Sequence, residues 1–218
     1  MQITRAASAL FLVAAPMLPL RAADSAPIGT STTSTTIGGQ RWTSSNLATT
    51  RFRNGDPIPE ITDAAAWAAA GRSGKPAWVR YGNAGTAPAG WGVLYNYAAV
   101  TDRRGLCPAG YRVPGNKDWQ ALESALGGGA KAARALKAST GWPAGAGSNS
   151  SGFAALPAGF RTQRGDYFLG NRVAYFWSAD REANGTTIAH MLFDDARPLF
   201  RIEYDVAMGM SVRCVAPA

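Results

Sequence analysis

Residues 105–128 read GLCPAGYRVPGNKDWQALESALGG and lead from a cysteine into the clearest helix pattern of the chain. Asn116 can cap this helix, Asp118 complements the positive end of the helix dipole, and Gly127 can end it. The apolar residues recur at i, i+3 and i+7, which is the spacing of one buried helix face. They are Trp119, Leu122 and Leu126. The pattern therefore predicts an amphipathic helix over 116–126.

The N-terminal residues 1–23 have the pattern of a signal peptide. Arg5 gives a positive start, and the apolar segment 6–20 that follows is short for a membrane span. Small residues then offer a cleavage site, and an uncleaved membrane anchor is the alternative. Residues 24–36, DSAPIGTSTTSTT, are rich in Ser and Thr and predict a flexible leader. We expect an exported protein, periplasmic, cell-surface or secreted, with one domain over 37–218.

Export decides how the two cysteines, Cys107 and Cys214, are interpreted. In an oxidising compartment, two cysteines far apart in sequence usually form a disulfide, and closing so long a loop contributes roughly 4–5 kcal/mol in the chain-entropy model. A pair of reduced, buried cysteines is the alternative. A disulfide would tie the turn before the main helix to the end of the domain, and no thiol would remain for nucleophilic or metal chemistry.

The chain is basic, with a formal net charge of +8 that comes almost entirely from arginine. Loss of residues 1–23 removes Arg5 and Arg21 and leaves 20 basic and 14 acidic residues, a net charge of +6. The charges are scattered, without a basic run or a nucleic-acid motif. A solvated basic surface is the simplest explanation of this charge, and the alternative is contact with acidic polysaccharides or anionic envelope surfaces, which an exported basic protein meets. We expect a glycan or an envelope or surface protein as partner, with no nucleic acid and no membrane span after cleavage.

The remaining pattern predicts short elements separated by many loops. Further helices are expected over 62–70 and 130–138, and strands or buried extended segments over 77–81 and 91–100. Four strands follow near the C-terminus, bounded by turn residues. Their predicted ranges are 174–178, 187–193, 199–204 and 210–215. Helices followed by antiparallel strands indicate an α+β domain with two main helices, long loops and one disulfide.

An ordered set of longer motifs covers the chain after the leader. They are IGGQRW (37–42), NLATTRFRNGDPIP (46–59), GVLYNYAAV (92–100), residues 105–128, LKASTGW (136–142), NSSGFAALPAGFR (149–161), AYFWSAD (174–180) and SVRCV (211–215). Through this set the chain resembles the Fibrobacter succinogenes major paralogous domain family. The resemblance implies a C-type-lectin-like fold, distantly similar to formylglycine-generating sulfatase-modifying enzymes. It implies an exported or surface-associated domain and no particular activity.

Few residues suit catalysis. His190 is the only histidine and lies within a predicted strand, which favours a structural role, and no G-x-S-x-G motif occurs. Oxidation of the formylglycine-generating kind requires a pair of active-site cysteines. Because Cys107 and Cys214 are both assigned to the disulfide, such an activity is disfavoured.

Acidic pairs near the C-terminus are candidates for calcium binding. Asp194-Asp195 are adjacent, and Glu203 and Asp205 alternate on a predicted strand, so either pair could bind Ca²⁺ together with backbone carbonyls. The alternative is that these acids are solvated or paired with arginines such as Arg197 and Arg201. The Glu-Pro-Asn, Gln-Pro-Asp and Trp-Asn-Asp signatures of calcium-dependent lectins are absent. We therefore expect no required cofactor, with Ca²⁺ as the one candidate.

Loops near 140–151, 163–172, 181–186 and 194–198 would form the ligand-binding face of a C-type-lectin-like domain. The candidate ligand-binding residues on these loops are Trp142, Asn149, Tyr167, Arg181, Asn184 and Asp194. Of the seven tryptophans, we expect at most two to be exposed. We predict a non-catalytic recognition module for a glycan or a protein. The alternatives are a structural or tip subunit of a surface assembly and an enzyme of the formylglycine-generating type.

Overall fold

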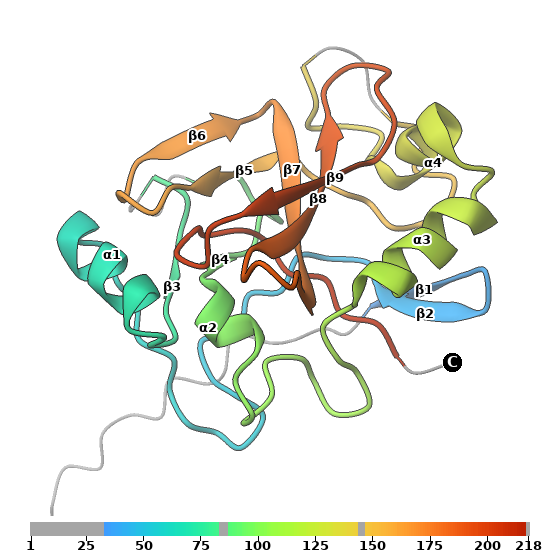
Figure 1. The fold of residues 1–218 in the computed structure, drawn as a ribbon. Helices are drawn as coiled ribbons and strands as arrows, with labels where there is room; N and C mark the ends of the chain where they lie inside the picture. Colours follow the sequence, from blue (N-terminus) through green and yellow to red (C-terminus); the bar gives the residue numbers. More distant parts are fainter. Residues whose placement is uncertain (1–32, 83–86, 144–146, 217–218) are drawn as a thin grey trace, which may run out of the picture.

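The computed structural model describes residues 33–82, 87–143 and 147–216, which form an α+β fold (Figure 1). The helices are α1 (Ala64–Arg72), α2 (Tyr97–Val100), α3 (Asn116–Ala125) and α4 (Gly129–Leu136). Two small sheets pair β1 (Ser34–Ile37) with β2 (Gln40–Thr43) and β3 (Trp78–Val79) with β4 (Leu94–Tyr95). The predicted signal peptide lies outside the described residues. The last residues of the predicted leader do not form a separate segment, because they belong to β1.

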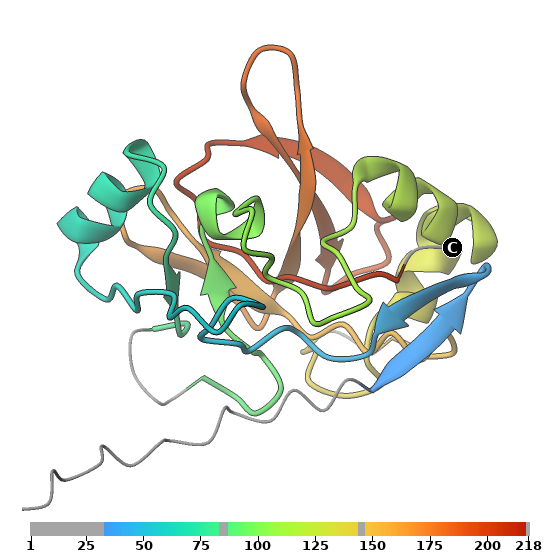
Figure 2. The same ribbon diagram turned by 90° about the horizontal axis from the view of Figure 1, so that it is seen from below.

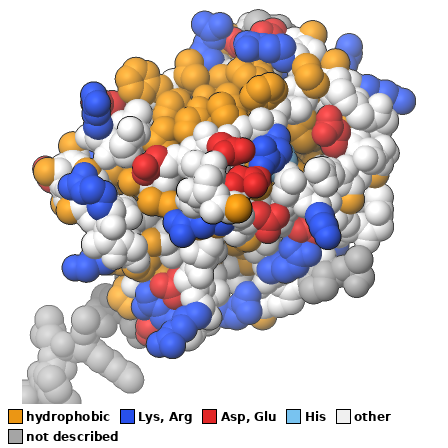
Figure 3. All heavy atoms as spheres, in the orientation of Figure 1, with side chains coloured by type: hydrophobic (Ala, Val, Ile, Leu, Met, Phe, Trp, Pro, Cys, Tyr) orange, Lys and Arg blue, Asp and Glu red, His pale blue; other side chains and the backbone are white. Residues whose placement is uncertain are grey.

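The largest sheet has five strands in the order β6-β5-β7-β8-β9. The strands are β5 (Ala158–Arg161), β6 (Tyr167–Gly170), β7 (Val173–Arg181), β8 (Thr187–Phe193) and β9 (Phe200–Tyr204). All neighbours are antiparallel except β5 and β7, which run parallel where Gly159 lies opposite Ala174. Helices α1 and α4 lie at opposite ends of the molecule with the sheet between them (Figure 2). Hydrophobic side chains gather on the outer surface over this sheet (Figure 3).

The predicted helices are confirmed, with one change of cap and one added helix. Gly115, not Asn116, is the N-cap of α3, and Asp118 accepts a hydrogen bond from the Gly115 N–H at 2.7 Å. The segment 91–100 is not extended throughout, because α2 forms at its end. The side chain of Asn96 accepts a hydrogen bond from the Ala99 N–H and so starts this extra turn of helix.

The disulfide between Cys107 and Cys214 is confirmed, with an S–S distance of 1.99 Å. The prediction of a regular strand over 210–215 is wrong. This segment makes isolated bridges to several different partners, including Tyr95 with Met210 and Trp42 with Val215. It crosses the interior and shares its backbone hydrogen bonds among separate segments, so no single neighbouring strand exists for it to pair with.

All seven tryptophans are buried, so none is available as an exposed platform for stacking sugars. Trp119 on α3 packs in an aromatic cluster with Trp42, Phe153 and Phe176. His190 on β8 stacks on Trp119 with ring centroids 4.9 Å apart, and burial lowers the pKa of His190 to about 3. This histidine is therefore a neutral core residue, as its position within a strand indicates.

Arg213 is buried beside the disulfide, with 1% of its surface exposed. Its guanidinium donates to the Asn46 side chain and to the carbonyls of Thr43, Phe153 and Ala154 at 2.6–3.0 Å. It also lies 4.4 Å from the ring centroid of Phe153. Each of these acceptors is neutral, and burial lowers the pKa of Arg213. One side chain thus joins three segments that lie far apart in the sequence.

Arg161 on β5 is a second buried arginine, at the α1 end of the sheet. It donates to the carbonyls of Gly165, Ile61 and Thr62 and lies 4.7 Å from the ring centroid of Trp67. Burial lowers the pKa of Arg161, and nearby acids, including Asp63, oppose that shift. Its hydrogen bonds fix β5 to the segment that enters α1.

Candidate functional site

Two of the six predicted ligand-binding residues lie in the interior. Trp142 is 7% exposed and donates from its indole nitrogen to the Ala155 carbonyl at 2.9 Å. Asp194 is buried and pairs with Arg172. The expectation that Trp142 and Asp194 are exposed on a loop face is wrong, because each side chain satisfies its polar group inside the protein.

The other predicted residues are more accessible but do not gather at one place. Asn149 holds its own turn, since its side chain accepts from the Ala154 N–H at 2.8 Å. Tyr167 is half-buried on β6 and packs edge to face with Tyr81. Asn184 lies in the exposed β7–β8 turn and bonds Thr186. Arg181, at the end of β7, is the one member of the six that lines the cleft described next.

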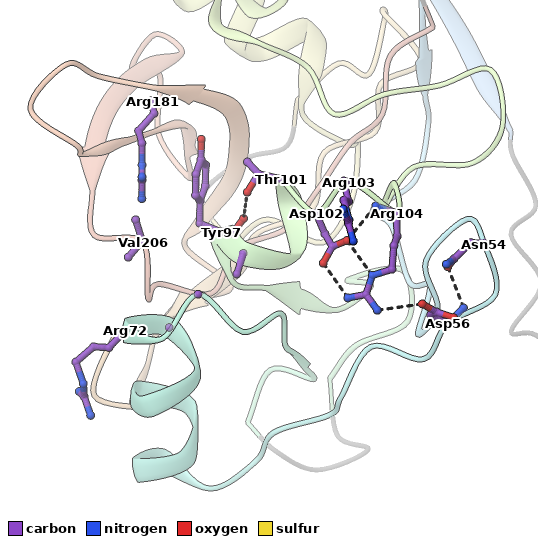
Figure 4. A pocket seen from close by; sticks show the side chains of 13 residues that line it. Asn54, Asp56, Arg72, Tyr97, Thr101, Asp102, Arg103, Arg104, Arg181 and Val206 are labelled. Carbon is purple, nitrogen blue, oxygen red and sulfur yellow. Dashed lines mark hydrogen bonds and ion pairs between the residues drawn. The ribbon is translucent and has the colours of Figure 1, made fainter.

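An open cleft of about 900 Å³ lies between α1, α2 and the end of β7 (Figure 4). Its walls come from the C-terminal end of α1, from α2 and the loop that follows it, and from the turn at residues 54–56. That turn, Asn54-Gly55-Asp56, is held by a hydrogen bond from the Asp56 N–H to the Asn54 side chain. Four arginines line the cleft: Arg72, Arg103, Arg104 and Arg181.

Arg104 is fully engaged by two carboxylates on one wall (Figure 4). It donates to Asp102 from Nε at 2.9 Å and from Nη2 at 2.8 Å, and to Asp56 from Nη1 at 3.1 Å. Its guanidinium also lies 4.0 Å from the ring centroid of Phe52. The bonds from Arg104 lower the pKa of Asp102, whereas the pKa of Asp56 is lowered first by its bond with Asn54 and then by its bond with Arg104. Arg104 therefore holds this wall in shape and leaves both carboxylates ionised at neutral pH.

The other three arginines of the cleft are exposed and form no ion pair with a carboxylate within the described ranges. Arg181 lies 5.5 Å from the ring centroid of Tyr97 on α2. The Tyr97 hydroxyl donates to the Ala179 carbonyl at 2.7 Å, and burial raises the pKa of Tyr97. Tyr97 thus gives Arg181 a fixed aromatic support, while Arg72 and Arg103 extend from α1 and from the loop after α2. The cleft presents positive charge that the protein itself does not neutralise.

Comparison with known proteins places the chain in a family. Residues 35–216 match the Fibrobacter succinogenes major domain. The chain belongs to the Fibrobacter succinogenes major domain family. No curated protein matches this member of the family, and no solved structure matches it.

In this Fibrobacter succinogenes major domain the cleft has few groups for acid–base or metal chemistry. Its acids, Asp56 and Asp102, are held ionised by Arg104. Within the part of the chain that the structure describes, no three His, Cys, Asp or Glu residues lie close enough together to hold a metal ion. No helix there is long and apolar enough to cross a bilayer. What the cleft does carry is positive charge, from the exposed side chains of Arg72, Arg103 and Arg181.

The acidic pairs considered for calcium are used by arginines and by the backbone. Asp195 pairs with Arg197 at 2.8 Å, and Glu203 lies 3.5 Å from Arg201, which confirms the arginine partners that the sequence suggested. Asp205 accepts a hydrogen bond from the Ala207 N–H. Among the described residues, none of these acids belongs to a group of three or more His, Cys, Asp or Glu side chains that could hold a metal ion.

In the sequence of this Fibrobacter succinogenes major domain, no pattern marks Arg72, Arg103 or Tyr97 as functional. The three come from separate segments, and none belongs to a short motif with a chemical meaning. The adjacent pair Arg103-Arg104 was the one local signal of concentrated positive charge. Its meaning depends on Asp102 and Asp56, which neutralise Arg104 and leave Arg103 unpaired.

Proposed function

We propose that this protein is an exported, non-catalytic recognition module with a C-type-lectin-like fold, and that it binds an acidic glycan in the arginine cleft. The observation that carries the proposal is the set of three exposed arginines, Arg72, Arg103 and Arg181, that line one cleft without carboxylate partners in the described structure. Guanidinium groups bind carboxylates and sulfates through paired, charge-assisted hydrogen bonds.

The shape of the cleft supports a glycan as the ligand. It is open to solvent and wide enough for sugar units, and Thr101 and the side chain of Asn54 add polar groups to its lining. The ligand's negative groups would meet the arginines, while its hydroxyls would meet these polar groups. A protein ligand with acidic side chains is the competing occupant, and the experiment below separates the two.

Export is supported by the disulfide. Cystines form and persist in oxidising compartments, and this one ties residues 107 positions apart in the chain. The same bond argues against an enzyme of the formylglycine-generating type, because no free cysteine is present among the described residues. A structural or tip subunit of a surface assembly remains the alternative role for such a domain.

The test is binding of the purified protein to an array of neutral, uronic-acid-containing and sulfated glycans. We expect binding to acidic glycans that weakens as salt is added, because the exposed arginines are screened by ions. Arg103→Glu/Arg181→Glu should weaken binding by about tenfold or more, since two charge-assisted contacts become repulsive. Calorimetry with the best acidic glycan would give the affinities.

The matched control is Arg134→Glu/Arg164→Glu, which makes the same change of charge outside the cleft. It should bind nearly as well as the wild-type protein. Equal binding of neutral and acidic glycans, or equal loss in both double variants, would contradict the proposal. If the purified protein binds no glycan on the array but captures an acidic protein, the ligand of the cleft is a protein and not a glycan.

A further inference from the structure

Strand β9 forms one edge of the five-stranded sheet. It pairs with β8 from Thr187 opposite Tyr204 to Met191 opposite Phe200. No second strand pairs with β9 in the described part of the chain. An edge strand presents unpaired backbone N–H and C=O groups, which makes it a template for another strand.

The opposite edge, β6, is protected in a way that β9 is not. Leu169 within β6 and Asn171 just after it have φ angles of 58° and 66°, which bend the backbone out of the extended form. The Gly170 N–H already donates to the Tyr81 hydroxyl at 3.1 Å. No residue of β9 has a positive φ, so this edge is regular over its whole length.

The two faces of β9 differ sharply in chemistry. Phe200, Ile202 and Tyr204 share one face, and Phe200 is 49% exposed there. This face continues across the sheet through Met191 and Tyr175 to Phe160, and Figure 3 shows hydrophobic side chains gathered over this region. The other face of β9 carries the remaining two residues, Arg201 and Glu203. Both are exposed at the edge and also have partners within the chain: Arg201 pairs with Glu182, and Glu203 accepts a hydrogen bond from the Thr186 hydroxyl. The strand is therefore apolar on one face and carries one charge of each sign on the other.

We infer that two copies of this chain associate through β9, paired antiparallel about a twofold axis at Ile202. In this register Phe200 lies opposite Tyr204 of the second copy, and Ile202 lies opposite its own counterpart. Arg201 lies opposite Glu203 of the second copy, and the twofold axis repeats this pair. Cross-strand pairs of opposite charge and of apolar side chains both stabilise an antiparallel sheet. A twofold interface requires such a self-complementary surface.

Other symmetric registers lose this match. Pairing about Arg201 places two arginines opposite each other, and pairing about Glu203 places two glutamates opposite each other. A shift by a single residue places Ile202 opposite Arg201 and mixes charged with apolar side chains on both faces. Only the register about Ile202 places apolar side chains opposite apolar side chains on one face and arginine opposite glutamate on the other face.

Charge reversal provides the test, read by sedimentation velocity over a wide range of protein concentration. The wild-type protein should show a monomer–dimer equilibrium. Arg201→Glu and Glu203→Arg each place like charges opposite each other twice per dimer and should weaken association by about tenfold. The two single variants mixed together should regain it, because each glutamate of one chain then faces an arginine of the other.

The mixture separates pairing between chains from effects within a chain. Each single variant has two like charges side by side on its own β9, and mixing does not change that, so regained association can come only from contact between copies. Arg164→Glu, a reversal on the β5–β6 turn, is the matched control and should associate as the wild type does. A wild-type protein that stays monomeric at its highest soluble concentration overturns the inference. So does a dimer that the single variants do not weaken or that the mixture does not restore.

Discussion

The two buried arginines hold opposite ends of the domain in different ways. Arg213 has fully buried acceptors for most of its bonds and connects segments up to 170 positions apart. Arg161 bonds to its own hairpin and to the nearby entry of α1, and two of its acceptors are only partly buried. Water can replace Arg161 at those two carbonyls, but it cannot reach the three buried acceptors of Arg213, on Asn46, Thr43 and Phe153. A buried charge is therefore more important where its partners have no other source of hydrogen bonds.

Replacement of Arg213 should have the largest effect on stability. Arg213→Leu leaves the Asn46 side chain and three carbonyls without their donor and should lower the free energy of unfolding by about 3–5 kcal/mol. Urea unfolding followed by circular dichroism measures the loss. Arg134→Leu, an exposed arginine on α4, is the control and should change little. Similar urea midpoints for the two variants would mean that the hydrogen bonds of Arg213 make no net contribution to the free energy of unfolding.

Replacement of Arg161 should have a smaller effect. Arg161→Leu keeps an apolar contact with Trp67 and exposes the Ile61 and Thr62 carbonyls to solvent, so the expected loss is about 2 kcal/mol. Urea unfolding measures this loss as well, and the critical result is that Arg161→Leu loses less stability than Arg213→Leu. A loss as large as that of Arg213→Leu would contradict the role given to solvent access.

Acidification should have the smallest effect of the three on stability, and it acts through His190 in the aromatic cluster beside Arg213. His190 belongs to the aromatic cluster that Arg213 contacts, and its pKa falls from 6.5 to about 3 because it is buried and lies near Arg201. Below pH 6.5 the unfolded chain takes up a proton that the folded protein refuses, so stability is lost as pH falls. From pH 7.5 to 5.5 the loss should be about 1 kcal/mol.

This pH window isolates the histidine. Asp56 and Asp102 have lowered pKa values and stay ionised throughout it. His190→Phe keeps a ring stacked on Trp119 and should flatten the dependence of urea stability on pH between 7.5 and 5.5. An unchanged slope in that variant would assign the effect to other groups.

Local signals explain what the sequence predicted well. The helix over 116–126 follows from an apolar spacing and from Asp118, both within a dozen residues, and the disulfide follows from there being two cysteines and a signal-peptide pattern. The extra helix α2 was missed because a single Asn96 cap starts it inside an apolar run.

Long-range contacts explain the rest. The motif SVRCV at 211–215 alternates like a strand, and nothing near Arg213 indicates that it is buried. Its acceptors lie 59 to 170 positions away. The cleft likewise combines arginines from three separate segments, of which sequence analysis named only Arg181. Trp142 was a ligand-binding candidate because of its place on a predicted loop, yet its indole donates to a carbonyl in the interior.

The burial of all seven tryptophans gives the protein an optical reporter of its own. An indole shielded from water emits at shorter wavelength than one in water, so the folded protein should fluoresce toward the blue. No tryptophan lines the arginine cleft, whereas Trp119 and Trp42 lie in the cluster around Phe153 that Arg213 contacts. Emission should therefore shift to the red when the domain opens and stay almost constant when the cleft is occupied.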